Sequence, residues 1–252
     1  MTIPGRPERL IATFFADDTT VYLSKDDDFG DLQQILDEWC IASGAKFNIG
    51  KTKVIPIGSP EYREVLRQQH FLNGEDGTSI PEHIKIAREG DAIRSLGALI
   101  GNGISQTMPW SRVLEKIDKS LERWEQSRPT MEGRCLIISM IVGGMTQYLT
   151  EVQGMPKEIE TRLEKRIRNF LWNDRTHVRV NKETIYAPIK KGGRNLLDLL
   201  ARNEAITVTW IQSYLDLSEN RATWAYVADA LIARTSGKIF SSLEYPEIPP
   251  NS

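Results

Sequence analysis

Residues 10–23 read LIATFFADDTTVYL, and two adjacent carboxylates, Asp17 and Asp18, stand in the middle of this run. Apolar and β-branched residues flank the pair, and the small residue Ala16 precedes it. This pattern predicts a β-hairpin with both carboxylates at its turn. Acidic residues on a rigid turn suit phosphoryl transfer, because Mg²⁺ takes hard oxygen ligands and neutralises charge on the reacting oxygens. A solvated Asp-Asp turn explains the same residues, because turns favour aspartate.

Further segments follow in the motif order of one enzyme family. Phe15-Ala16-Asp17-Asp18-Thr19 resembles the catalytic hairpin of reverse transcriptases of non-LTR, LINE-like retrotransposons. Residues 44–52 (GAKFNIGKT) are similar to the next palm motif, and residues 94–101 (RSLGALIG) are similar to the primer-grip hairpin. Two later segments resemble the region after the palm: residues 142–148 (VGGMTQY) and 192–198 (GGRNLLD).

The resemblance implies an RNA-directed DNA polymerase, a nucleotidyltransferase that adds deoxynucleotides to a primer 3′-OH with two Mg²⁺ ions. It implies that Asp17 is the catalytic metal ligand and that Asp18 is its partner at the turn. Lys51 would supply a proton or a positive charge to the leaving pyrophosphate. A surface lysine is the alternative for Lys51, because Lys46 and Lys53 lie close to it in the sequence.

The same resemblance implies which residues place the primer and which nucleic acids are the partners. Leu96 and Gly97 would place the primer 3′ end, where glycine permits close approach of the backbone. An RNA template and a DNA primer are the implied partners. Phe15 departs from the tyrosine that many polymerases of this class have, and the family tolerates aromatic residues at this position.

The predicted catalytic hairpin begins at Leu10, whereas it lies in the middle of a reverse transcriptase. The segments with the other metal-binding aspartate, the nucleotide pocket and the fingers would precede it, and Glu8 is the only acid before the hairpin. A two-metal site needs carboxylates from two strands. We therefore expect the C-terminal half of a polymerase, inactive alone and with Mg²⁺ bound weakly or not at all. The upstream half is a candidate partner.

The chain is expected to be α+β, with a change of pattern at residues 107–109. Short apolar segments and turns predict a partial palm over residues 1–108, with helices packed on a sheet. Apolar residues at helical spacing predict an α-helical thumb bundle over residues 109–234. Residues 235–252 end in a proline-containing stretch and are expected to be a disordered tail.

Individual elements follow from local signals. A helix is expected over Phe29–Ser43 with Gly44 as its stop, and another begins at Ser59-Pro60-Glu61 with serine as its N-cap. Strands are expected at His83–Ala87 and Leu96–Ile100. In the thumb, a helix is expected with Trp110, Val113, Leu114, Ile117, Leu121 and Trp124 on its buried face. Later helices are expected over Arg134–Val152, interrupted at Gly143-Gly144, from Pro156, over Arg202–Leu215 and over Arg221–Ile232.

Composition is ordinary, with 40% hydrophobic and 26% charged residues. No stretch reaches the roughly 18 uninterrupted apolar residues of a membrane span, and the first residues lack an apolar signal-peptide core. No membrane partner is therefore expected. Cys40 and Cys135 have no metal-ligand spacing and are expected as reduced thiols, in a nuclear or cytoplasmic setting.

Charge is unevenly distributed along the chain. The net charge is −2, which is low for a nucleic-acid-binding protein. Residues 109–194, however, hold 17 Lys and Arg against 11 Asp and Glu, a net charge of +6. The predicted helix from Pro156 carries the candidate nucleic-acid-binding residues Lys157, Arg162, Lys165, Arg166 and Arg168.

Phosphate contacts by this helix would allow sequence-independent tracking of a nucleic-acid backbone. The alternative is a solvated face of mixed charge, with i,i+4 ion pairs such as Glu158–Arg162 and Glu164–Arg168. Two further functions stay open for the whole chain. It could be a non-catalytic helical module that binds nucleic acid or protein, or an unfolded relic whose missing strands expose sheet edge and core.

Overall fold

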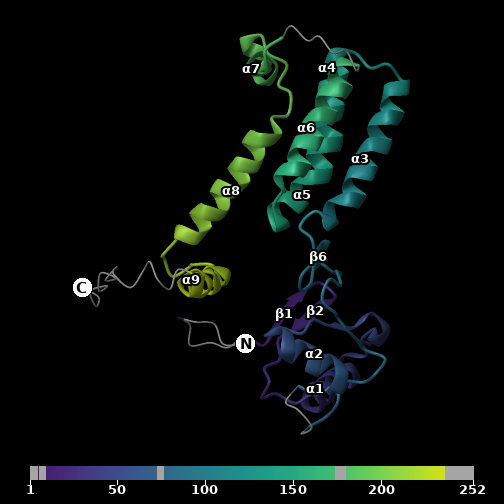
Figure 1. The fold of residues 1–252 in the computed structure, drawn as a ribbon, viewed down its shortest axis with the longest axis vertical. Helices are drawn as coiled ribbons and strands as arrows, with labels where there is room; N and C mark the ends of the chain where they lie inside the picture. Colours follow the sequence, from purple (N-terminus) through teal and green to yellow (C-terminus); the bar gives the residue numbers. More distant parts are fainter. Residues whose placement is uncertain (1–4, 6–9, 73–76, 174–179, 236–252) are drawn as a thin grey trace, which may run out of the picture. The chain divides into compact units, whose positions relative to one another are not determined.

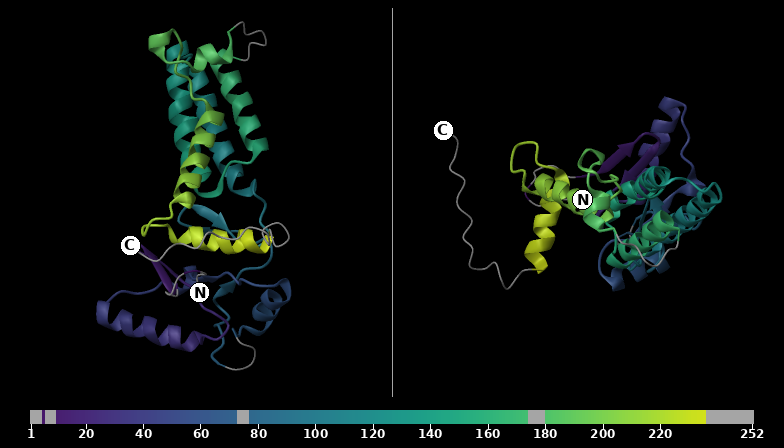
Figure 2. Two further views of the ribbon diagram at one scale, coloured as in Figure 1. Left: turned by 90° about the vertical axis from the view of Figure 1, so that its left-hand side faces the viewer. Right: turned by 90° about the horizontal axis from the view of Figure 1, so that it is seen from above.

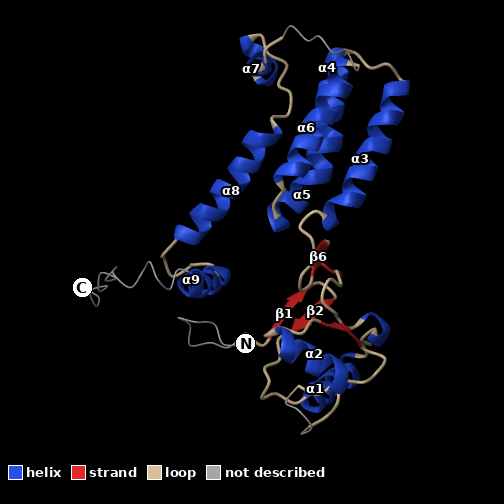
Figure 3. Ribbon diagram, viewed as in Figure 1, coloured by secondary structure: helices blue, strands red, loops and turns tan. Residues whose placement is uncertain are grey.

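The computed structural model describes residues 5, 10–72, 77–173 and 180–235. These residues fall into two compact units: the described residues of 1–25 and 209–252, and those of 26–208. Figure 3 shows mostly helix and a few short strands, which form three two-stranded sheets in the described part of the chain. The expected α+β class is confirmed at this level. Its assignment to a palm and a thumb stays a prediction.

The described residues of the first unit include a hairpin and helix α9. Strands β1 (Ala12–Phe15) and β2 (Asp18–Val21) pair antiparallel. Helix α9 (Thr223–Thr235) packs through Trp224, whose ring centroid lies 5.1 Å from that of Trp210 in an edge-on arrangement. Trp210 belongs to the part of α8 (Leu199–Leu215) that lies in this unit.

The N-terminal part of the second unit confirms several local predictions. Helix α1 (Phe29–Ser43) begins after Asp28, which accepts from the backbone N–H of Gly30 at 2.6 Å, and it ends at Gly44 with a left-handed φ of 71°. Helix α2 (Pro60–Gln69) has the expected Ser59 cap, which accepts from Tyr62. Phe29, Leu32 and Leu36, which recur at helical spacing along α1, are only half-buried.

Two small sheets are formed by strands that precede and follow α2 in the sequence. Strand β3 (Lys53–Val54) pairs in parallel with β4 (Lys85–Ile86), so the strand expected at His83–Ala87 is shorter than predicted. The expected strand Leu96–Ile100 is instead the turn and second strand of a hairpin, formed by β5 (Ile93–Ser95) and β6 (Ala98–Ile100). A short 3₁₀ helix, η1 (Ile49–Lys51), precedes β3. Leu66, Ile80, Ile84 and Ile86 are buried in this part of the unit.

The C-terminal part of the second unit is a helical cluster with the main core. Figures 1 and 2 show its longer helices running side by side. The elements are α3 (Met108–Gln126), α4 (Met131–Ile138), the π-helical turn η2 (Ser139–Gly143), α5 (Gly144–Gln153), α6 (Lys157–Trp172), α7 (Lys182–Tyr186), η3 (Ile189–Lys191) and the start of α8.

Helix α3 buries most of its expected face. Trp110, Leu114, Ile117 and Leu121 are each at most 4% exposed, whereas Trp124 is 38% exposed. The facing helices contribute the remaining large side chains of the core, including Ile138, Val142, Leu163, Phe170 and Leu199. Helical spacing therefore predicted this core, apart from its end at Trp124.

The expected interruption at Gly143-Gly144 is a π-helical turn, and the helix runs on from Met131 to Gln153. This segment is long and apolar enough for a membrane span by length and composition, contrary to the sequence expectation. Core helices pass the same test, and Ile138, Val142 and Leu149 of this segment are buried in the cluster.

The predicted boundary at residues 107–109 lies inside the second unit, at the start of α3. The domain assignment stays a prediction. The tail expected at residues 235–252 lies outside the described residues, apart from Thr235 at the end of α9.

Candidate functional site

The carboxylate hairpin forms as predicted. Phe15 pairs with Asp18, so Ala16 and Asp17 are the two central residues of a two-residue turn. Ala16 has a φ of 53°, the left-handed conformation that tight hairpin turns need at their first central position. Asp17 is therefore in the turn, Asp18 is the first residue of β2, and both side chains are exposed.

The metal-binding role of this pair stays a prediction. Asp17 and Asp18 offer the hard oxygen donors that Mg²⁺ takes. The described residues contain no cluster of three or more Asp, Glu, His or Cys side chains that could hold a metal ion. The pair therefore fits part of a magnesium site, and further ligands would have to complete it.

Lys51 ends the short helix η1, where its backbone N–H donates to the Asn48 side chain at 3.2 Å. Its side chain is exposed. Lys51 lies in the second unit and Asp17 in the first, and each unit is described by itself. The expected cooperation of Lys51 with the carboxylates stays a prediction.

Leu96 and Gly97 form the turn of the second hairpin. Ser95 pairs with Ala98, and the φ angles of Leu96 and Gly97 are 46° and 88°. Two positive φ angles match a type I′ turn, and Leu96 is strained in this conformation because it has a Cβ atom. A Cβ atom at Gly97 would lie 3.0 Å from the Tyr148 ring. Gly97 thus permits the close approach of the Tyr148 ring, and the expected approach of a primer 3′ end stays a prediction.

Helix α5 holds this hairpin through two side chains. The hydroxyl of Tyr148 donates to the carbonyl of Leu96. The Gln153 side chain accepts from the Leu99 N–H at 3.0 Å and donates to the Leu99 carbonyl at 2.6 Å. The sequence assigned no role to Tyr148 or Gln153, although Tyr148 ends one of the segments that carry the resemblance.

The candidate cations of α6 divide into two groups. Arg166 bridges to α3 through Asp118 at 3.2 Å and Glu125 at 3.1 Å, and Arg162 reaches Asp118 at 3.4 Å. Lys157 pairs with Glu160 on its own helix. Lys165 and Arg168 are exposed and form no ion pair with the described residues.

The two expected i,i+4 pairs on α6 are wrong for the described structure. Arg162 turns to Asp118 on α3 rather than to Glu158. Glu164 pairs with Lys182 of α7 at 3.7 Å rather than with Arg168. Contacts between helices replace contacts along one helix because α3 and α7 bring opposite charges to the same side chains.

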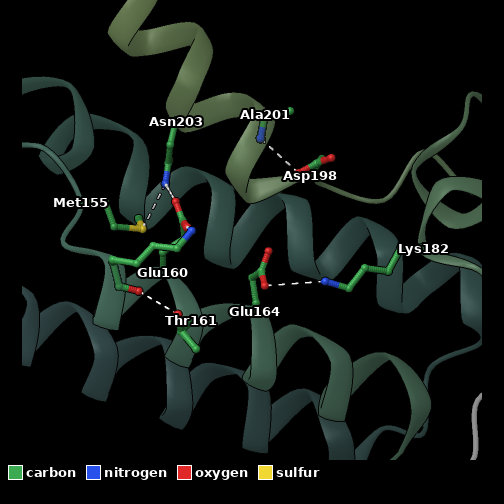
Figure 4. A network of polar contacts seen from close by, with 9 residues as sticks. Met155, Glu160, Thr161, Glu164, Lys182, Asp198, Ala201 and Asn203 are labelled. Carbon is green, nitrogen blue, oxygen red and sulfur yellow. Dashed lines mark hydrogen bonds and ion pairs between the residues drawn. The ribbon is translucent and has the colours of Figure 1, made fainter.

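A polar network ties α6 to α8 (Figure 4). Glu160 is 6% exposed and accepts from Lys157 and from Asn203 of α8, the latter at 3.0 Å. Burial alone would raise the pKa of Glu160, but the hydrogen bonds from Lys157 and Asn203 outweigh it and lower the pKa. Asp198 caps α8 by accepting from the Ala201 N–H at 3.1 Å.

Helix α3 carries a second set of cations that the sequence reasoning missed. Their spacing of four, three and four residues places them on one side of a helix that turns about 100° per residue. This side is opposite the buried stripe of Trp110, Leu114, Ile117 and Leu121. We call this set the α3 basic ridge, and its members are Arg112, Lys116, Lys119 and Arg123.

All four ridge side chains are exposed, and none forms an ion pair with the described residues. The acids that pair across the helices, Asp118 and Glu125, lie on the flank of α3 that faces α6. The sequence contained a signal for this ridge, because the cations repeat at helical spacing within a predicted helix.

No protein-family model matches the chain, and no curated protein matches it. The resemblance to reverse transcriptases therefore rests on the motif residues themselves, in their order along the chain.

Proposed function

We propose that the chain belongs to a retroelement RNA-directed DNA polymerase and that its helical cluster binds nucleic acid through phosphate contacts. The α3 basic ridge carries this proposal. Its four cations repeat along an exposed helix face and form no ion pair with the described residues, although the exposed Glu115 and Glu122 lie three or four residues from them on the same helix. A row of unpaired cations on a rigid helix suits the backbone of a nucleic acid, which presents one phosphate after another.

Helix α6 offers further cations for phosphate contacts. Lys165 and Arg168 are exposed, and Arg162 retains a 61% exposed side chain beside its contact with Asp118. Arg166, at 21% exposure, has a structural role between the helices. We therefore assign binding to Lys165 and Arg168, and assign the α3–α6 connection to Arg166.

The two hairpin turns support the polymerase origin. The motif residues Asp17 and Gly97 both occupy tight two-residue turns, and each turn contains a residue with positive φ. Such turns present their residues on a rigid frame, as a catalytic carboxylate and a primer-positioning loop require. Two Mg²⁺ ions, once bound, would activate the primer 3′-OH and neutralise the leaving pyrophosphate.

We do not propose that this chain adds nucleotides on its own. Asp17 and Asp18 are two neighbouring carboxylates, whereas two metal ions need ligands from separate elements. The described residues bring no third metal ligand to them. Binding of RNA template and DNA primer, rather than nucleotide addition, is the property that this chain should show.

A non-catalytic module that binds a protein is the second candidate. Leu136, Met140 and Val152 belong to one continuous helical segment and are 42–72% exposed. Exposed apolar side chains often mark a protein interface. This observation fits a protein partner whether or not the chain is part of a polymerase.

The experiment that tests the proposed function is a titration of a fluorescently labelled RNA–DNA hybrid with the full chain at two salt concentrations. Non-specific phosphate binding predicts dissociation constants of ~10⁻⁴ to 10⁻⁶ M that weaken steeply as salt rises. If the chain does not bind the hybrid at low salt, the proposed nucleic-acid binding is wrong, and the protein-binding module becomes the favoured function.

A further inference from the structure

A cavity of about 350 Å³ opens between α2 and the loop that follows β4. None of its lining residues belongs to α3, to α6 or to either hairpin turn. Pro56, Pro60 and Ala87 give it apolar walls. Its charged lining consists of Arg63, Glu64, Arg67, Arg88 and Glu89.

Two of the three arginines are neutralised within the cavity. Arg67 donates through Nε to Glu64 at 2.9 Å, and this contact, together with Gln68, lowers the pKa of Glu64 to about 2. The Nη2 atom of Arg63 lies 3.0 Å from the Glu89 carboxylate, and its Nη1 donates to the Gly58 carbonyl at 3.1 Å. Both glutamates are thus used by these arginines.

One guanidinium is left over. Arg88 is exposed at the same cavity and forms no ion pair with the described residues. Three arginines and two glutamates line the cavity, so its lining carries a net charge of +1. An anion that enters the cavity would meet the donors of Arg88 beside this positive charge.

We propose that this cavity binds a small phosphate monoester, whose oxygens accept from the Arg88 guanidinium in a lining of net positive charge. A tetrahedral phosphate can accept from donors in different directions, and arginine is well suited to such recognition. The apolar walls would contact the organic part, and the volume lies within the usual range for small-molecule sites. This site is independent of the proposed nucleic-acid binding through the α3 basic ridge.

Calorimetric titration of the full chain with adenosine 5′-monophosphate, and with adenosine as the phosphate-free control, tests this site. We expect saturable binding of the monophosphate only. Arg88→Gln should weaken it about tenfold, because a charge-assisted hydrogen bond is lost. Arg94→Gln removes the same charge from an exposed residue of β5 outside the cavity and should leave binding unchanged.

A further variant distinguishes a specific effect on phosphate binding from a general loss of folding. Glu89→Gln releases Arg63 from its carboxylate and should strengthen phosphate binding. Equal binding of adenosine and its monophosphate, or equal weakening by Arg88→Gln and Arg94→Gln, would overturn the proposal. So would weaker binding in Glu89→Gln with unchanged thermal unfolding. Single-stranded oligonucleotides with and without a 5′-phosphate then show whether the phosphate belongs to a free nucleotide or to the end of a nucleic-acid strand. Only a site for strand ends binds the 5′-phosphorylated strand more tightly than the strand without the phosphate.

Discussion

The side-chain amide of Gln153 forms both a donated and an accepted hydrogen bond with the backbone of Leu99, at 2.6 and 3.0 Å. Gln153 thus satisfies the outer edge of β6 as a neighbouring strand would. The contact joins the hairpin around Leu96 and Gly97 to the end of α5. It gives that turn a fixed support within the second unit.

Replacement of Gln153 should destabilise this support. Gln153→Ala leaves a part-buried N–H and carbonyl of Leu99 without partners, which costs about 1–2 kcal/mol in the free energy of unfolding. Chemical denaturation of the full chain measures this change. Gln147→Ala on the same helix is the matched control, because Gln147 is exposed. Equal stability of the two variants would show that the Leu99 contacts contribute nothing.

Primer extension addresses the carboxylate turn. The full chain should extend no primer on an RNA template with Mg²⁺ or Mn²⁺, because Asp17 and Asp18 alone cannot hold two metal ions. Incorporation of labelled deoxynucleotide is the readout, and Asp17→Ala is the control. Incorporation by the wild-type chain that Asp17→Ala abolishes would mean that another acid completes the metal site.

The cations of α6 should separate into structural and binding residues. Arg166→Ala removes contacts to Asp118 and Glu125 and should lower the free energy of unfolding by about 1 kcal/mol. Lys165→Ala should leave unfolding unchanged and weaken binding of an RNA–DNA hybrid. Thermal unfolding and hybrid titration, made on both variants, check this division. Equal effects of the two variants on stability would argue against it.

Acid should weaken the connection between α6 and α8 through Glu160. The pKa of Glu160 is lowered below its ordinary value of 4.5 in the folded chain. The charged side chain therefore contributes stability above about pH 4.5, and this contribution is lost as the pH falls through the folded-state pKa. Denaturation at pH 7 and pH 4 should show a larger loss from Glu160→Gln at pH 7. A loss that is the same at both values would contradict this assignment.

Local signals predicted much of the fold. The Asp17–Asp18 turn, the Ser59 cap of α2 and the buried stripe of α3 depend on residues close together in the sequence, where turn chemistry and helical spacing act. The helix over Arg134–Val152 was expected with an interruption at Gly143-Gly144, whereas a π-helical turn at Ser139–Gly143 carries the helix through without a break.

Contacts between distant residues could not be predicted in the same way. Tyr148 and Leu96 are 52 residues apart, and Arg166 and Asp118 are 48 apart. Spacing indicates which face of a helix is buried, but it does not identify the element that packs there. The α3 basic ridge differs from these long-range contacts, because its four cations lie within one predicted helix and their spacing could have been read from the sequence. The denser charges of α6 drew the prediction to that helix instead.

The most direct test of the account is hybrid binding by the variant Arg112→Gln, Lys116→Gln, Lys119→Gln. The matched control is Lys53→Gln, Arg128→Gln, Lys190→Gln, which removes the same number of Arg and Lys charges from exposed residues of the second unit outside the ridge and outside the motif segments. We predict that the ridge variant binds a labelled RNA–DNA hybrid more weakly and reduces the slope of log K against log salt by about 2–3. The control should keep the wild-type slope. Equal slopes in the ridge variant and the control would contradict nucleic-acid binding by α3.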